Sequence, residues 1–208
     1  MIASAIIPAG EYVATADQRL VMYNVPWAHY EVQLALRGEA SVPRMAYLEG
    51  VLELMTPSKG HERTTHYLGR LVEMYALERD VTLSSYGSWT LKASPDQAGA
   101  EPDECYLFGP DQDRDRPDLV IEVIWTSGNI DKLAIYRRLR IPEVWFWQDG
   151  RLSVHVLDGL SYRAVERSTF LPELDLTALC TFLDRPTQTE AVRDFRTYLR
   201  TADSPPAR

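Results

Sequence analysis

The chain has 208 residues, 45% of them hydrophobic and 25% charged, which suits one globular domain with a sizeable core. It carries 22 Lys and Arg against 30 Asp and Glu, a net charge of −8, and this argues against a protein that coats nucleic acid through charge alone. The charge is compatible with a nuclease, because a metal site concentrates acidic residues.

The two cysteines, Cys105 and Cys180, lie far apart in the sequence, and we expect both to be buried free thiols. No Cys/His spacing indicates structural zinc, and no apolar run approaches the ~20 residues of a membrane helix. The first eight residues have no basic region and include Pro8, which argues against a signal peptide. We therefore expect a cytoplasmic protein with no membrane partner.

Residues 1–25 show little apolar density, and we expect them to form an N-terminal arm. Helical spacing of apolar residues follows over residues 27–38 and ends at a glycine. Two apolar runs flank Glu49-Gly50, which predicts a hairpin with a two-residue turn over residues 45–55. We expect one domain over residues 26–200 and a frayed tail over residues 201–208.

The remaining pattern alternates helices with strands. The longest amphipathic stretch predicts a helix over residues 61–78. Strands are predicted over residues 81–91, 102–108, 116–125 and 143–147, a loop over 94–100, helices over 130–140, 174–183 and 191–200, and two hairpin strands over 151–157 and 161–166. This order predicts an α/β fold, in the α+β sense of a mixed sheet with helices packed on it.

The predicted strand over residues 116–125 is apolar on both faces, which is typical of a central, covered strand. Glu122 lies in its middle. An ionised carboxylate buried there without a partner costs several kcal/mol, so it needs a cation, hydrogen-bond donors or a raised pKa. A structural salt bridge or a protonated acid would also satisfy Glu122.

Three residues together indicate chemistry: Asp103 at the start of one strand, Glu122 inside the next, and Lys132 on the following helix. Acids on paired strands can share a divalent cation, which activates water and stabilises charge on a phosphate. The ammonium of Lys132 can orient that water or balance negative charge. Alone, Asp103 could simply bond the local backbone, and Lys132 could be a solvated helix residue.

Other charged residues are candidates for supporting roles. Asp118 and Glu122 project to the same face of the predicted strand. Four residues along a strand span about 13 Å, however, which is too far for the two acids to share one ion. We therefore predict that Asp118 contacts the metal ligands and not the metal. We predict the same for His61 and Glu62 at the start of the long helix. Arg137, Arg138 and Arg140 follow the site closely and are candidate phosphate contacts, or else solvated helix residues.

Several segments together resemble the Uma-type restriction endonuclease family of the PD-(D/E)XK nuclease superfamily, over roughly residues 44 to 185. The segments are residues 47–58 with His61 and Glu62, 101–106, 116–123, 130–138 and 142–147. The resemblance implies a core of a helix, three antiparallel strands, a helix and a further strand. It implies Asp103 and Glu122 as the metal-binding acids, and it places the catalytic lysine at Lys132.

The function that the resemblance implies is a Mg²⁺-dependent endonuclease, with Mn²⁺ as a substitute cation and DNA as the expected substrate. The backbone carbonyl of Val123 is a candidate additional ligand. The chain departs from the plain superfamily pattern, because Ile124 stands two residues after Glu122 where a lysine is expected. The alternative is therefore a binding or assembly module with weak or no catalysis. We also expect a homodimer, formed through residues 144–147 and the C-terminal helices.

Overall fold

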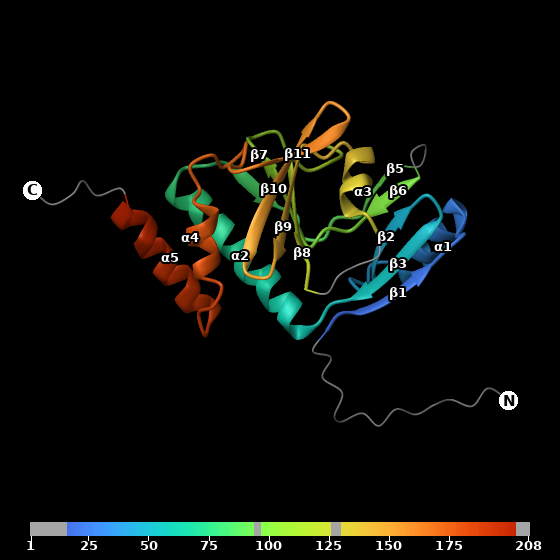
Figure 1. Ribbon diagram of the computed structural model, residues 1–208, viewed down its shortest axis with the longest axis horizontal. Coiled ribbons are helices and arrows are strands. Elements are labelled where there is room, and N and C mark those ends of the chain that lie inside the picture. Colours follow the sequence, from blue (N-terminus) through green and yellow to red (C-terminus); the bar gives the residue numbers. More distant parts are fainter. Residues whose placement is uncertain (1–15, 94–96, 126–129, 203–208) are drawn as a thin grey trace, which may run out of the picture.

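We describe the chain from a computed structural model, over residues 16–93, 97–125 and 130–202. Within these ranges the chain forms two sheets that lie side by side, with helices at both ends and behind (Figure 1). The mixed α+β class expected from the sequence is confirmed.

The first sheet has the strand order β1-β3-β2-β6-β5 and is antiparallel throughout. Its centre is the predicted hairpin, whose turn residues Glu49 and Gly50 have φ of 45° and 88°, as a type I′ turn requires. Helix α1 covers this sheet with Tyr30, which stacks on Tyr47. The elements are β1 (Gln18–Met22), α1 (Trp27–Arg37), β2 (Arg44–Leu48), β3 (Val51–Thr56), β5 (Leu91–Ala93) and β6 (Ala98–Ala100).

The second sheet has the order β11-β10-β9-β8-β7-β4, with β8 near its middle and paired parallel to β9. Of the strands between α2 and α3, this sheet takes three that pair antiparallel, β4, β7 and β8, and β9 follows α3, which is the core order that the family resemblance implies. Its elements are α2 (Lys59–Glu78), β4 (Leu83–Ser85), β7 (Glu104–Phe108), β8 (Leu119–Val123), α3 (Lys132–Arg138), β9 (Glu143–Gln148), β10 (Arg151–Asp158), β11 (Ser161–Val165), α4 (Leu176–Thr181) and α5 (Gln188–Ala202).

The two faces of the second sheet are buried by different parts of the chain. One face packs against α2, α4 and α5, and its apolar core includes Leu119, Ile121 and Trp145. The other face packs against α3 and the first sheet, with Val120 and Val144 among its buried residues. Since β8 is covered on both faces, its double-sided apolar pattern is explained.

Some predicted elements differ from the structure. The single strand expected over residues 81–91 is two strands in different sheets, because Gly87, with φ of 56°, turns the chain away from β7. The end of the expected loop over residues 94–100 forms β6, and residues 18–22 of the expected arm form β1. Residues 126–129, where the central strand was expected to end, lie outside the described residues.

The expected dimer surface was partly wrong. Val144 and Trp145 are fully buried inside the chain, because Trp145 packs in the core with α2, α4 and α5 and Val144 packs on the opposite face with α3 and the first sheet. They therefore cannot provide an external surface. The homodimer itself, and the division into arm, domain and tail, stay predictions. Among the described helices, none is long and apolar enough to cross a membrane.

Candidate active site at the junction of the two sheets

Glu122 projects from β8 toward α3 and is 5% exposed. Its Oε1 accepts a 3.0 Å hydrogen bond from the Lys132 ammonium and a second, short one from the Tyr136 hydroxyl. Both hydrogen bonds that Glu122 accepts from the described residues go to this one oxygen. The cation and the donor that a buried carboxylate requires are thus both present.

Helix α3 presents these two donors together because they lie four residues apart, on one face of a helix. Asp131 begins the helix by accepting a hydrogen bond from the Ala134 backbone, which sets Lys132 in the first turn. Burial, together with the negative charge of Glu122, raises the Tyr136 pKa well above its usual value. Tyr136 therefore stays a neutral donor. Tyr136 was not predicted from the sequence, although its position four residues after Lys132 is a signal that the sequence contains.

Asp103 lies just before β7, next to Glu122. Glu104 pairs with Ile121 in the antiparallel register, so one further step sets Asp103 opposite Glu122, on the same face of the sheet. The Asp103 carboxylate confirms this nearness, because its Oδ2 accepts a 2.6 Å hydrogen bond from the Val123 backbone N–H. The structure therefore brings Asp103, Glu122 and Val123 together.

Asp103 Oδ1 is met by two basic side chains. Arg44, from the start of β2, forms a short ion pair with it, and Nε2 of His61 lies 3.0 Å away. The His61 approach is poorly aligned for a hydrogen bond, and we interpret it as an electrostatic contact. Arg44 also reaches Glu62, with 3.1 Å between Nη2 and Oε1. Since Arg44 lies far from Asp103 in sequence, no local pattern could identify it.

His61 is fully buried in the first turn of α2, where Ser58 caps the helix by accepting a hydrogen bond from the His61 backbone N–H. Its Nδ1 lies 3.0 Å from Oδ2 of Asp17. Burial of Asp17 opposes ionisation, but the hydrogen bonds from His61 and from the Ser58 backbone outweigh it and lower the Asp17 pKa to about 2. His61 thus connects Asp17 to Asp103, an arrangement that falls in the expected arm and was not predicted.

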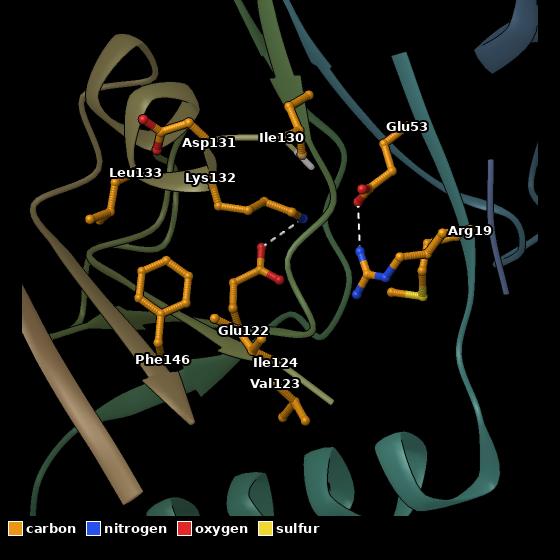
Figure 2. A pocket seen from close by; sticks show the side chains of 11 residues that line it. Arg19, Glu53, Glu122, Val123, Ile124, Ile130, Asp131, Lys132, Leu133 and Phe146 are labelled. Atoms are coloured by element: carbon orange, nitrogen blue, oxygen red, sulfur yellow. Dashed lines mark hydrogen bonds and ion pairs between the residues drawn. The ribbon is translucent and has the colours of Figure 1, made fainter. Parts of the chain in front are cut away.

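A pocket of about 240 Å³ opens beside Glu122. Figure 2 shows Lys132 and Glu122 on one side of it and the ion pair of Arg19 and Glu53, from β1 and β3, on the other. The pocket is lined by Arg19, Glu53, Met55, Glu122, Val123, Ile124, Ile130, Asp131, Lys132, Leu133 and Phe146. It therefore lies where the two sheets meet, with charged groups from both.

The other predicted residues lie farther from this pocket. Asp118 accepts hydrogen bonds from the Phe108 backbone and from Arg114, both at 2.7 Å, at the opposite end of β8. Arg137, Arg138 and Arg140 line a separate hollow of about 250 Å³ at the C-terminal end of α3, and Arg138 pairs with Glu49. Lys132 stands at the other end of that helix, so these arginines could contact only a ligand that extends along α3.

The donor types at the site fit a hard divalent cation, which prefers carboxylate and carbonyl oxygens. Asp103, Glu122 and the Val123 carbonyl could hold such an ion. Arg44 pairs with Oδ1 of Asp103 and Lys132 pairs with Oε1 of Glu122, so one oxygen of each carboxylate already has a basic partner. Within the described ranges, no three or more His, Cys, Asp and Glu side chains are already arranged around one metal position.

Comparison with known proteins identifies a matching family and a similar solved structure. The sequence model of the Uma2 family, described as putative restriction endonuclease, matches residues 27–185. A crystal structure of a putative nuclease belonging to DUF820 from Anabaena variabilis ATCC 29413 is similar, with a TM-score of 0.46 and 13% sequence identity over 81% of this chain and 98% of that chain. No curated protein matches.

Proposed function

The chain belongs to the Uma2 family of putative restriction endonucleases, and from this membership we propose that it is a Mg²⁺-dependent endonuclease that hydrolyses phosphodiester bonds of DNA. The observation that carries the proposal is the convergence of Asp103 and Glu122 from neighbouring antiparallel strands, with the Lys132 ammonium on Glu122. Restriction-endonuclease-like enzymes typically use divalent metals, and this donor set suits one.

In this proposal Asp103, Glu122 and the Val123 carbonyl hold the cation. The cation, when bound, activates water and stabilises charge on the phosphate. Lys132 orients the attacking water or balances the negative charge that develops at phosphorus. Arg44 and His61 hold Asp103 in place through their contacts with Oδ1, and Tyr136 does the same for Glu122.

The test is cleavage of supercoiled plasmid, linear duplex, single-stranded DNA and RNA with Mg²⁺ or Mn²⁺, and with a chelator as the blank. Asp103→Asn and Glu122→Gln keep side-chain size and should each lower the cleavage rate by roughly 100-fold or more. Glu78→Gln is the matched control, since it removes an arginine-paired carboxylate at the far end of α2. Wild-type rates in both site variants would eliminate the mechanism.

A second candidate is a nuclease-fold binding or assembly module. Two observations favour it: Ile124 occupies the usual lysine position, and Asp103 is already neutralised by Arg44. Calorimetric titration with Mg²⁺ and Mn²⁺ separates the two candidates, because the module needs no cation. Cleavage of only non-nucleic-acid phosphodiesters would instead indicate a different metal-dependent hydrolase.

We also propose that the chain forms a homodimer, with the exposed faces of the C-terminal helices as the interface in place of β9. Light scattering at micromolar concentration measures the mass directly. A monomeric mass would contradict the dimer without bearing on the chemistry.

A further inference from the structure

Glu53 is a buried carboxylate that the proposed chemistry has not used. It lies in the middle of β3, is 2% exposed, and its Oε1 accepts a 2.7 Å hydrogen bond from Arg19. Its other oxygen, Oε2, is buried and has no hydrogen-bond partner among the described residues. Leaving a buried acceptor unpaired costs about 1–3 kcal/mol, and more when the group is charged, so a partner for Oε2 is expected.

The position of Glu53 indicates what that partner is. Glu53 lines the same pocket as Glu122 and Lys132, and Figure 2 shows the two glutamates reaching into it from opposite sides. They come from different sheets, since Glu53 belongs to β3 and Glu122 to β8. Nothing about their spacing in sequence would pair them.

We propose that Glu53 is a third carboxylate of the metal site, whose Oε2 accepts a hydrogen bond from water on the divalent cation held by Glu122. This inference rests on the proposed function. A small divalent cation such as Mg²⁺ keeps several of its waters, and those waters donate hydrogen bonds to nearby acceptors. Arg19 holds the carboxylate through Oε1, which leaves Oε2 as the oxygen without a partner among the described residues.

The competing explanation is purely structural. Arg19 Nε is also buried without a partner among the described residues, so one ordered water could satisfy it together with Glu53 Oε2. In that case Glu53 would contribute to folding and would have no effect on the affinity for a cation. The two explanations therefore differ in a quantity that can be measured without any assay of cleavage.

The experiment measures Mn²⁺ affinity from the electron paramagnetic resonance signal of free Mn²⁺, for the full chain and three variants. Glu53→Gln keeps an oxygen for Arg19 but removes the charge, and we expect it to weaken Mn²⁺ binding by roughly 10- to 100-fold. Glu122→Gln should weaken binding at least as much. Glu78→Gln, with the same change in net charge far from the pocket, should bind like the wild type.

The outcomes separate this inference from the proposed function. Wild-type affinity in Glu53→Gln, with weakened binding in Glu122→Gln, would overturn the role of Glu53 and leave the metal site standing. A wild-type chain that binds no Mn²⁺ would overturn both. Equal weakening in Glu78→Gln would show a general charge effect and would also overturn the role of Glu53.

A second variant guards against misfolding. Glu53→Asp keeps a charge for Arg19 but withdraws the oxygens by one methylene, and we expect weaker Mn²⁺ binding with the fold retained. The upward shift in Tm on adding Mn²⁺ compares each variant with itself, because the free energy of unfolding that the ion adds is set by its affinity and concentration. Equal Mn²⁺-induced shifts in the wild type and both Glu53 variants would contradict the inference.

Discussion

Glu143 and Glu122 are buried on opposite faces of the six-stranded sheet, and the two carboxylates are stabilised in opposite ways. Glu143, on the face covered by α2, α4 and α5, is fully buried and accepts hydrogen bonds of 2.6–2.7 Å from Trp145 Nε1, the Ser168 hydroxyl and the Thr169 backbone. Glu122, on the face toward α3, relies on the charged Lys132 and lies beside a pocket.

The difference separates a carboxylate that belongs to the fold from one that can take a ligand. Both oxygens of Glu143 are engaged by neutral donors, which leaves no place for a cation. Lys132 and Tyr136 both donate to the same oxygen of Glu122, Oε1. The side chain of Lys132, the cationic partner, is 20% exposed to solvent. We therefore expect substitutions on the first face to change stability and those on the second face to change chemistry.

The largest effect on stability is expected for Glu143→Ala. It removes the acceptor of three buried donors, and we expect a loss of about 3–4 kcal/mol in the free energy of unfolding. Glu143→Gln, which can still accept on one oxygen, should lose about 1–2 kcal/mol. Urea denaturation measures both, and a loss below about 1 kcal/mol in the alanine variant would remove the contrast between the faces.

Lys132→Met should change the rate of cleavage more than the stability of the fold. Cleavage should fall by roughly 100-fold, equivalent to about 2.7 kcal/mol of transition-state stabilisation, while the free energy of unfolding should fall by less than in Glu143→Ala, because the Tyr136 hydroxyl still donates to Glu122. Lys92→Met, at an exposed lysine of the first sheet, is the matched control. Rates within a factor of about two of the wild type would exclude Lys132 from the chemistry.

Glu104 provides a pH test of the face toward α2. Burial raises the Glu104 pKa to about 7, helped by repulsion from Glu73 and opposed by a hydrogen bond from Ser85. An unfolded glutamate loses its proton near its usual pKa of 4.5, so between these values the unfolded chain binds fewer protons than the folded one. Stability should therefore fall as pH rises through this window.

Glu104→Gln should remove that dependence. We expect the free energy of unfolding of the variant to decline by about 1–2 kcal/mol less than that of the wild type between the two pKa values. Urea midpoints at each end of the window give the comparison. Parallel curves for the two proteins would show that Glu104 ionises normally in the fold.

The smallest effect is expected for Asp17→Asn, whose carboxylate contacts His61 beside the candidate active site. Because the Asp17 pKa is lowered to about 2, its ionised form stabilises the fold above its usual pKa of 3.8, and this contribution is lost as pH falls through 2. The variant should be about 1 kcal/mol less stable at neutral pH, and the difference should vanish in acid. A difference that stays constant with pH would indicate a packing effect instead.

The sequence predicted the fold and the carboxylate positions where local signals sufficed. The double-sided apolar pattern of β8 identified the central strand, and the Glu49-Gly50 and Asp149-Gly150 turns appear with positive φ at all four residues. Cys105 and Cys180 are free thiols, as expected, but Cys105 is buried and Cys180 is only half-buried. These features depend on a few neighbouring residues, so periodicity and turn chemistry were enough.

The rest of the site depends on pairing between distant segments. Arg44 meets Asp103 because the start of β2 lies beside the segment that leads from β6 into β7, and Arg19 meets Glu53 because β1 pairs with β3. β1 lies in a stretch of weak pattern, so neither it nor Asp17 could be predicted. The three-residue strand β6, with the sequence Ala-Gly-Ala, resembles a loop in composition and is a strand only because β2 and β5 flank it.

Where the two sheets meet, the first sheet contributes the small side chains of Ala46, Ala98 and Ala100, which pack in one cluster with Val120 and Ile135. Glu53 and Glu122 lie on opposite sides of this contact between the sheets. The distance between their carboxylates therefore depends on the separation of the two sheets and not on the register of either strand. The alanine methyl groups therefore act as spacers. On the proposed metal site, enlarging one of them would change which ion radius fits between the two glutamates, although no charged group is altered.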